Sequence, residues 1–230
     1  MFWNWLFRWT FPGMFIRLLF PVHIEGLENL PKSGPYIIAA GPHRTEFESL
    51  ILASNFPKLW LRFFAKAEYW DRRLLGVLMT AIGLLPIPRD GKKALVQQVK
   101  LGVDVLEAGG ILAIYPEATR GYDDLVHKGY PGVARISLKA GGVPIVPVGL
   151  LGMRKLNPSG HKLRLGKATI VVGEPIVPSS FLTKDEETVV GAALQTLLTP
   201  RLTARISEAI ADLTPYKYSD TLLPIPGVQK

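Results

Sequence analysis

The strongest constraint on the fold is a short apolar run at residues 111–115, which carries no charge and follows two glycines. An uncharged run of this length beside turn residues predicts a strand that is buried on both faces. Residues 36–40, between Pro35 and Gly41, have the same character, and an amphipathic segment with helical spacing covers residues 92–107. Because strand-like and helix-like segments alternate along the chain, the sequence predicts one α/β domain with a largely parallel central sheet flanked by helices.

The other expected elements follow the same alternation. We expect further strands over residues 22–27, 61–66, 83–88, 143–149 and 163–173, and helices over residues 46–55, 69–81, 129–140 and 183–213. The first of these helices is expected to begin near Arg44 or Thr45, and the last to open with a capping box and to break near Pro200. Two prolines predict that the strand at 143–149 lies at a sheet edge or contains a bulge.

A length of 230 residues suits one α/β domain with its own core and a small appendage. We expect the domain to cover residues 22–213, between a distinct segment at residues 1–21 and a loose, turn-rich tail at residues 214–230. The absence of cysteine excludes disulfides, thiolate metal sites and a cysteine nucleophile. A net charge of +8 with 48% hydrophobic residues fits an anionic membrane surface better than nucleic acid, and no nucleic-acid-binding motif is present.

The N-terminal 20 residues contain three Trp, five Phe, two Arg and no acidic residue. Arg8, Arg17 and the pair Pro12-Gly13 interrupt the apolar stretch, so it differs from a secretory signal and from an ordinary spanning helix. Aromatic residues mixed with arginine favour the headgroup region of a bilayer. We therefore expect a membrane-interfacial anchor over residues 1–21; a short spanning or half-inserted segment and a helix packed on the domain are the alternatives.

His43 follows the expected strand at residues 36–40 and precedes a helix, which puts it at the carboxyl edge of the sheet. Histidine side chains in general exchange a proton near neutral pH, so His43 can act as a general base. Such a base needs an acceptor for its other ring nitrogen, and Glu48 or Glu46 can supply one. Local spacing leaves open the alternative of an ordinary loop histidine followed by glutamates that the helix dipole favours.

Other polar side chains also follow expected strands. They are Lys66, Arg89, and the group Glu117, Thr119 and Arg120. Because the carboxyl ends of parallel strands meet at one edge of a sheet, we expect these side chains to share one cleft with His43. Each alone is weak evidence, since an arginine after a strand is usually a solvated residue. A base together with several cations suits a hydroxyl-bearing anionic substrate such as a phosphate ester.

The order of these segments resembles the glycerolipid acyltransferase family, which includes the 1-acylglycerol-3-phosphate acyltransferases. The matching segments are His43 to Glu48 for the histidine–aspartate motif, the alanine–lysine pair at 65–66, residues 83–89 for the glycine–arginine motif, Tyr115 to Arg120 for the Phe-Pro-Glu-Gly-Thr-Arg motif, and residues 143–148 for the proline motif. The resemblance spans residues 22–178, and the order of its motifs makes it specific.

Two positions depart from the family pattern. Glu48 stands where the family has aspartate, so the carboxylate that orients the histidine is one methylene longer, and Glu46 remains an alternative partner. Ala118 replaces the glycine of the third motif. If that position needs a positive φ, alanine costs about 1 kcal/mol there or changes the turn.

The resemblance implies transfer of a fatty acyl group to the hydroxyl of 1-acylglycerol 3-phosphate, which gives phosphatidic acid in phospholipid synthesis. The donor would be acyl-CoA or acyl carrier protein. His43 would take the proton of the attacking hydroxyl, and Glu48 would hold the imidazole in the right tautomer. The resemblance implies no metal and no bound cofactor.

The resemblance also implies which residues bind the acceptor. Lys66, Arg89 and Arg120 would bind its phosphate, and Glu117 and Thr119 would position its glycerol or shape the pocket. The protein would then be membrane-associated, on the cytoplasmic face. The alternatives are another lysolipid or polar-lipid acceptor, or a non-catalytic module that binds anionic lipid at a membrane surface.

Overall fold

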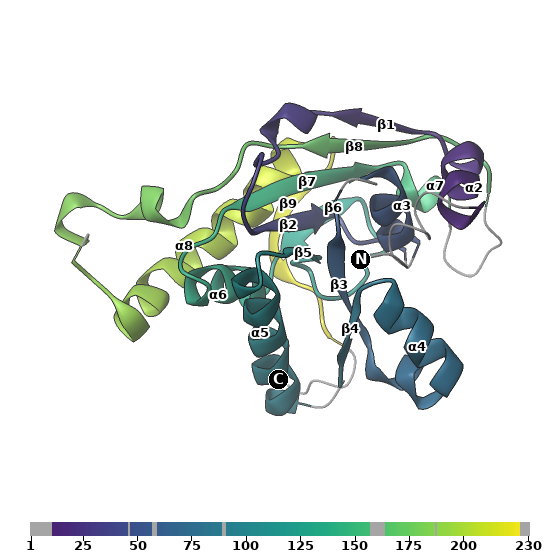
Figure 1. Ribbon diagram of the computed structural model, residues 1–230. Coiled ribbons are helices and arrows are strands. Elements are labelled where there is room, and N and C mark those ends of the chain that lie inside the picture. The colour runs from purple at the N-terminus through teal and green to yellow at the C-terminus, as the bar shows by residue number, and fades with distance from the viewer. Residues whose placement is uncertain are drawn as a thin grey trace.

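The computed structural model describes residues 11–45, 47–56, 59–88, 91–156, 164–186 and 188–225. A seven-stranded sheet forms its centre, in the order β1-β8-β7-β2-β5-β3-β4 (Figure 1). Its strands are β1 (Val22–Glu25), β2 (Tyr36–Gly41), β3 (Leu61–Lys66), β4 (Leu84–Ile87), β5 (Ile111–Ile114), β7 (Ile145–Leu151) and β8 (Ala168–Val172). All neighbouring pairs are parallel except β7 with β8, which confirms the predicted α/β fold with a mostly parallel sheet.

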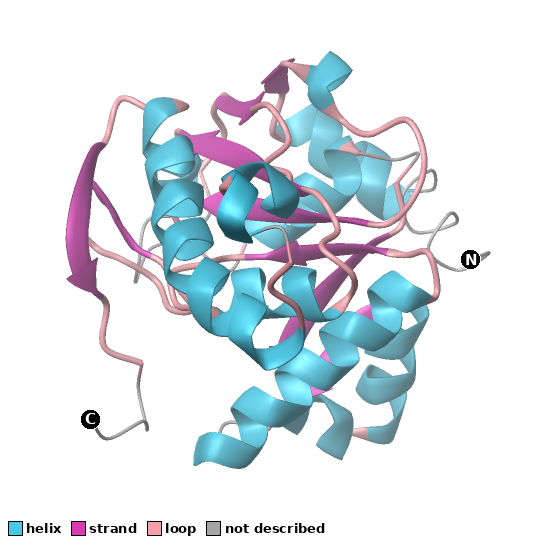
Figure 2. Cartoon of the chain, turned by 90° about the vertical axis from the view of Figure 1, so that its left-hand side faces the viewer, coloured by secondary structure: helices cyan, strands magenta, loops and turns pink. Residues whose placement is uncertain are grey.

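Helices connect the strands and cover both faces of the sheet. The α-helices are α2 (Phe11–Leu19), α3 (Glu48–Asn55), α4 (Arg73–Ala81), α5 (Gly91–Glu107), α6 (Gly132–Lys139), α7 (Met153–Leu156) and α8 (Gly191–Asp212), and the 3₁₀ helices are η1 (Leu27–Asn29), η2 (Ala67–Asp71), η3 (Pro178–Phe181) and η4 (Lys184–Glu186). Helices α5, α6 and α8 lie together on one face, in front of the sheet in Figure 2. Helices α2, α3 and α7 lie on the other face.

Strand β2 is buried along its whole length because both of its faces meet helices. Ile37 and Ala39 belong to the core under α5, α6 and α8, whereas Tyr36, Ile38 and Ala40 belong to the core under α2, α3 and α7. This alternation follows from the two-residue period of a strand. The lack of charge that predicted a doubly buried strand therefore has its physical cause in two separate hydrophobic cores.

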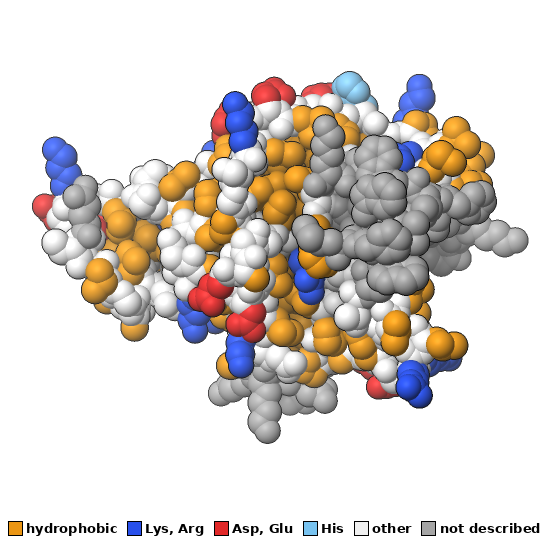
Figure 3. Space-filling view, viewed as in Figure 1, with side chains coloured by type: hydrophobic (Ala, Val, Ile, Leu, Met, Phe, Trp, Pro, Cys, Tyr) orange, Lys and Arg blue, Asp and Glu red, His pale blue; other side chains and the backbone are white. Residues whose placement is uncertain are grey.

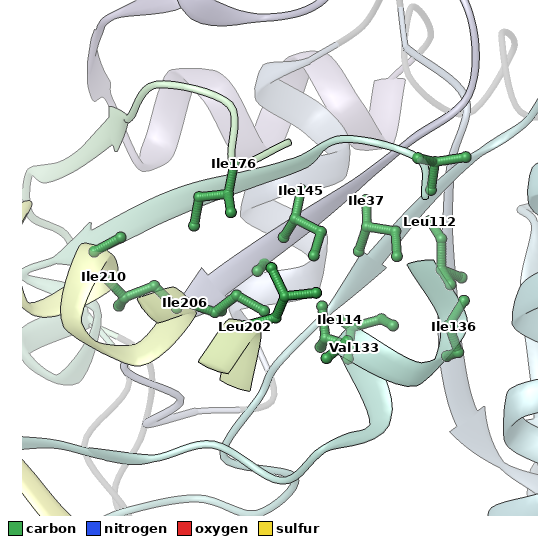
Figure 4. Close-up of a cluster of buried hydrophobic side chains, with 14 of the residues drawn as sticks. Ile37, Leu112, Ile114, Val133, Ile136, Ile145, Ile176, Leu202, Ile206 and Ile210 are labelled. Carbon is green, nitrogen blue, oxygen red and sulfur yellow. The ribbon is translucent and has the colours of Figure 1, made fainter. Parts of the chain in front are cut away.

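Figure 4 shows the first of these cores. Ile37 and Ile145, from neighbouring strands, face Leu202 and Ile206 of α8. All four side chains are at most 1% exposed. Burying an aliphatic side chain of this size contributes about 1.5–3 kcal/mol, so α8 is held firmly against the sheet that carries His43.

Of the two outcomes predicted for the proline-containing strand, the edge position is wrong. Strand β7 lies inside the sheet, between β2 and β8, rather than at an edge. Its ladder with β8 begins at Val148 opposite Val172, and Ile145 pairs again with Ile176, so the partner segment has one extra residue across from Pro147, the kind of irregularity that was predicted as a bulge. On that side only the carbonyl of Pro147 is used, as acceptor for the Gly173 N–H at 2.9 Å. The missing N–H of proline therefore breaks no ladder hydrogen bond.

Two predicted helix boundaries are also corrected. Helix α3 begins at Glu48 rather than near Arg44 or Thr45, because the side chain of Glu48 accepts both of their backbone N–H groups in a turn before the helix. Helix α8 begins at Gly191 and continues through Pro200 without a break. The predicted capping box closes only the short helix η4, where Glu186 accepts the N–H of Thr183 at 3.0 Å.

The described part of the tail, up to residue 225, is not loose. Strand β9 (Lys217–Leu222) pairs in parallel with β6 (Leu125–Lys128), which the sequence patterns did not predict. The two strands form a small second sheet beside α8, at the left edge of Figure 2. The C-terminal segment is thereby fixed next to the loop that follows β5.

The N-terminal helix α2 packs on the domain through one side. Arg17 donates a hydrogen bond from Nη1 to the carbonyl of Ser54 at 2.8 Å, and the rings of Phe20 and Phe47 meet edge to face at 4.8 Å. The rest of the expected anchor, residues 1–10, lies outside the described residues. Within the described chain, no helix combines the length and apolar character needed to cross a bilayer.

Candidate active site

His43 is positioned by the end of the buried strand β2. The chain leaves β2 at Gly41 through a cis Gly41–Pro42 peptide bond, and His43 follows. The carbonyl of His43 accepts the N–H of Gly121 at 2.9 Å, which ties it to the loop after β5. Strands β2 and β5 are parallel neighbours, so their carboxyl ends bring these two loops to the same edge of the sheet.

The imidazole of His43 is hydrogen-bonded to Glu48. Nδ1 lies 2.7 Å from Oε2 of Glu48, whose side chain is fully buried, while 17% of the His43 side chain is exposed. Oε1 of the same carboxylate accepts the backbone N–H groups of Arg44 at 2.9 Å and Thr45 at 3.0 Å. An ionised carboxylate only accepts, so Nδ1 carries the proton and Nε2 is left as the basic nitrogen.

Tyr115 forms one wall of the imidazole site. Its ring stacks on that of His43 with centroids 4.1 Å apart and planes 13° from parallel, and its hydroxyl lies 3.0 Å from Oγ of Ser49. Burial, followed by the charge of Glu48, raises the pKa of Tyr115 well above its usual value, against the opposing hydrogen bond with Ser49. Tyr115 is therefore a neutral ring at physiological pH that fixes the plane of the imidazole.

Glu117 acts on the backbone of the site. Its carboxylate accepts the N–H of His43 at 2.6 Å on Oε2 and the N–H of His127 at 2.8 Å on Oε1. The residue is only 2% exposed, and burial raises its pKa, although the two N–H groups and the charge of Arg44 oppose that shift. Glu117 was expected to position the glycerol or to shape the pocket, and in this structure its two carboxylate oxygens bind backbone amides.

Arg44 is a buried cation that the sequence patterns did not single out. Its guanidinium donates to the carbonyl of Leu125, lies 3.8 Å from Oδ1 of Asp123, and stands 5.8 Å from the ring centroid of Tyr216. It also passes against Gly121, where any Cβ would collide with the guanidinium. No local signal could have found this role, because it depends on contacts with residues far along the chain.

A second histidine links this network to the C-terminal strand. Nε2 of His127 lies 2.8 Å from Oδ2 of Asp123, and its Nδ1 lies 3.0 Å from Oγ1 of Thr221 in β9. Burial raises the pKa of Asp123, but the hydrogen bond and charge of His127, with help from Leu125 and Arg44, lower it on balance. The loop after β5 is thus held between the His43 loop and β9.

The remaining predicted site residues fall into two groups. Lys66 ends β3, and Thr119 and Arg120 lie in the loop after β5, all half-buried at the same edge of the sheet as His43. Arg89 and Glu46 lie outside the described residues. The structure therefore brings His43, Glu48 and Glu117 into direct contact, and places Lys66, Thr119 and Arg120 at the same edge.

Comparison with known proteins gives a consistent result. A family model described as Acyltransferase matches residues 21–151. A chloroplastic 1-acyl-sn-glycerol-3-phosphate acyltransferase of Arabidopsis thaliana is 27% identical over 159 residues, which are 68% of this chain and 44% of the relative. The enzyme of that name from Bacillus subtilis is 25% identical over 162 residues, covering 70% of this chain and 76% of the relative. This chain thus spans less than half the length of the plant relative.

The fold has a counterpart among solved structures. The 1-acyl-sn-glycerophosphate acyltransferase PlsC from Thermotoga maritima superposes with a TM-score of 0.61 at 23% identity, covering 85% of this chain and 76% of that one. At this identity the likeness establishes the fold alone.

Proposed function

Because this chain belongs to the acyltransferase family, we propose that it transfers a fatty acyl group from a thioester to the free hydroxyl of 1-acylglycerol 3-phosphate. Two relatives with that named activity, from a plant and a bacterium, support the choice of acceptor. The observation that carries the proposal is the hydrogen bond between His43 and the buried carboxylate of Glu48 at 2.7 Å. Binding an anionic lipid needs no such pair, whereas deprotonating a hydroxyl does.

The proposed reaction uses Nε2 of His43 as the base. The acceptor hydroxyl oxygen attacks the thioester carbonyl carbon while Nε2 takes its proton, so a C–O bond forms and the C–S bond breaks. The imidazolium then returns the proton to the departing thiolate. Glu48 stabilises the imidazolium and keeps Nδ1 protonated, and Tyr115 and Glu117 position the ring and its backbone.

The proposed acceptor phosphate lies on the β3 side of His43. Lys66 at the end of β3 and Arg120 after β5 are half-buried cations at that edge, and Arg89 is assigned to the same group by its motif. Arginine suits this task because its planar fork makes paired charge-assisted hydrogen bonds to phosphate oxygens. Thr119 is proposed to position the glycerol.

We place the protein at a membrane surface on the basis of two exposed apolar helix faces. Met14, Phe15 and Leu18 of α2 are 57%, 45% and 77% exposed, and Leu74 and Val77 of α4 are 88% and 65% exposed. The two helices lie at the same end of the molecule (Figure 1), and apolar side chains gather over both of them (Figure 3). Exposed apolar side chains on two helices at one end of the molecule favour insertion among lipid headgroups, where the acceptor resides.

The test compares the buried pair with an exposed pair of the same chemistry. His43→Ala should reduce acyl transfer to 1-acylglycerol 3-phosphate by at least about 10²-fold, the usual contribution of a general base, and Glu48→Gln should also reduce kcat. His23 and Glu25 form a matched control, because they lie 3.3 Å apart with side chains 72% and 55% exposed. His23→Ala and Glu25→Gln should leave transfer unchanged.

The same assay separates the alternatives. Thiol release with other lysolipids, but not with 1-acylglycerol 3-phosphate, would keep the reaction and change the acceptor. Full activity of the His43→Ala protein would refute the mechanism. Binding of anionic vesicles without any thiol release, across a panel of acceptors, would show instead a non-catalytic lipid-binding module.

A further inference from the structure

A basic cleft lies on the other side of His43 from Lys66. It has a volume of about 490 Å³ and opens at the carboxyl end of β7. Three cations line it, Arg154, Lys155 and Arg164, together with Asp124 and the apolar surfaces of Leu151 and Tyr216. None of these residues belongs to the motifs that identify the family or to the mechanism above.

The topology of the sheet places this cleft beside the base. Strand β7 is the direct neighbour of β2, with Gly149 opposite Gly41, so the chain entering the cleft after Leu151 lies close to the loop that carries His43. Tyr216, in the cleft wall, also faces the guanidinium of Arg44, the residue after His43. Lys66 lies in the opposite direction, beyond β5 on β3. His43 therefore stands between two basic regions on one edge of the sheet.

The charge of the cleft is only partly neutralised. Arg154 forms an ion pair with Asp124 at 3.3 Å and donates to the carbonyl of Tyr122. The exposed side chains of Lys155 and Arg164 have no hydrogen bond or ion pair with any residue that the structure describes. Two cations are thus left to face the same hollow, an arrangement that attracts an anionic ligand.

We infer that this cleft binds the phosphate-bearing nucleotide end of coenzyme A when it carries the acyl group as the thioester donor. This inference rests on the proposed acyl transfer. A transferase must hold two substrates against one base, and the acceptor phosphate already has its cations on the β3 side. The volume lies in the range of pockets for small molecules, roughly 300–1,000 Å³. Tyr216 offers an aromatic face to adenine, while Lys155 and Arg164 match the phosphates. A carrier protein would instead need a broad basic surface.

Binding of adenosine 3′,5′-bisphosphate to the full chain, measured by calorimetry at fixed ionic strength, tests the site without any turnover. Lys155→Ala and Arg164→Ala should each raise Kd about tenfold, the loss of one charge-assisted phosphate contact. Lys100→Ala is the matched control, because Lys100 is an exposed lysine on α5 that does not line the cleft. It should bind like the wild type. Equal binding by all four proteins, or none by the wild type, would overturn the inference.

Kinetics give a second, independent readout. For the wild type, KM should be lower for acyl-CoA than for the same thioester of 3′-dephospho-coenzyme A, which lacks one phosphate. In a variant that combines Lys155→Ala with Arg164→Ala this difference should shrink, while KM for the lysolipid stays unchanged. A rise in acceptor KM instead would assign the cleft to the lysolipid, and use of acyl carrier protein with rejection of acyl-CoA would also overturn the inference. A wild type that binds the bisphosphate but acylates no lysolipid would refute the proposed function and leave the nucleotide site standing.

Discussion

Replacing Ala118 by glycine should stabilise the protein, because the backbone of this alanine is left-handed. Ala118 has a φ of 58°, a conformation in which its Cβ crowds the following carbonyl. The residue lies on the surface of the loop after β5, and its N–H donates to the carbonyl of Tyr115 at 3.0 Å. The turn at position 118 therefore holds an alanine where glycine would fit without strain.

The expected gain is the difference between two opposing effects. An L-residue in this conformation costs about 1–2 kcal/mol. Glycine in its place loses about 0.4–1 kcal/mol through the greater entropy of the unfolded chain. The net stabilisation by Ala118→Gly is therefore about 0.8 kcal/mol, which corresponds to a rise in Tm of about 2–3 °C for a chain of this length.

Ala108→Gly is the control, because it adds the same entropy to the unfolded chain without relieving a left-handed backbone. Ala108 is also an exposed alanine in a turn, directly after α5, but its φ is not positive. Its replacement should destabilise the protein by about 0.4–1 kcal/mol. The two variants should thus differ by about 1–2 kcal/mol in the free energy of unfolding, measured in urea with equal m-values. Equal losses of stability in both variants would refute the argument from backbone strain.

Two further predictions concern charged groups away from the imidazole of His43. Hydrogen bonds from Arg201 lower the pKa of Glu186 from 4.5 to about 2. The unfolded chain therefore protonates Glu186 at a higher pH than the folded protein does, and the stability that the ionised Glu186 contributes is lost as pH falls from about 4.5 to 2. Glu186→Gln should flatten that part of the pH dependence of unfolding, and superimposable curves would contradict it. Arg44→Met should lower the free energy of unfolding by about 1–3 kcal/mol by leaving the carbonyl of Leu125 without its donor; Arg135→Met, at an exposed position of α6, should change it by less than about 0.5 kcal/mol.

The sequence predicted the central strands well because their cause is local. An uncharged run must be buried on both faces, and β2 and β5 end within one residue of their expected limits. The prolines of β7 left both an edge and a bulge open, because their effect depends on which side of the strand needs an N–H, and that depends on where the ladder with β8 ends. Strand β9 was missed because its partner β6 is about 90 residues away and neither strand carries an uninterrupted apolar run.

Within the site, motif spacing locates residues but not their contacts. His43 and Glu48 are five positions apart, so their pairing could be anticipated together with the alternative of Glu46. The hydrogen bond from the backbone of His43 to Glu117 spans 74 residues, and that from Arg44 to Leu125 spans 81. Contacts at such separations are set by the order of strands in the sheet, which the sequence of a single chain does not reveal.

The longer carboxylate at position 48 is explained by where α3 begins. Glu48 is the first residue of the helix, where the positive end of the helix dipole stabilises a negative charge. From there its side chain reaches back across the turn, so that Oε1 takes the N–H groups of Arg44 and Thr45 while Oε2 meets the imidazole of His43. Three hydrogen bonds therefore satisfy the oxygens of a fully buried side chain, which would be costly to bury without partners. An aspartate on this backbone would be one methylene short of His43, so Glu48→Asp should fold with the same turn and lose kcat more than KM, whereas an equal loss in both would indicate a role in binding.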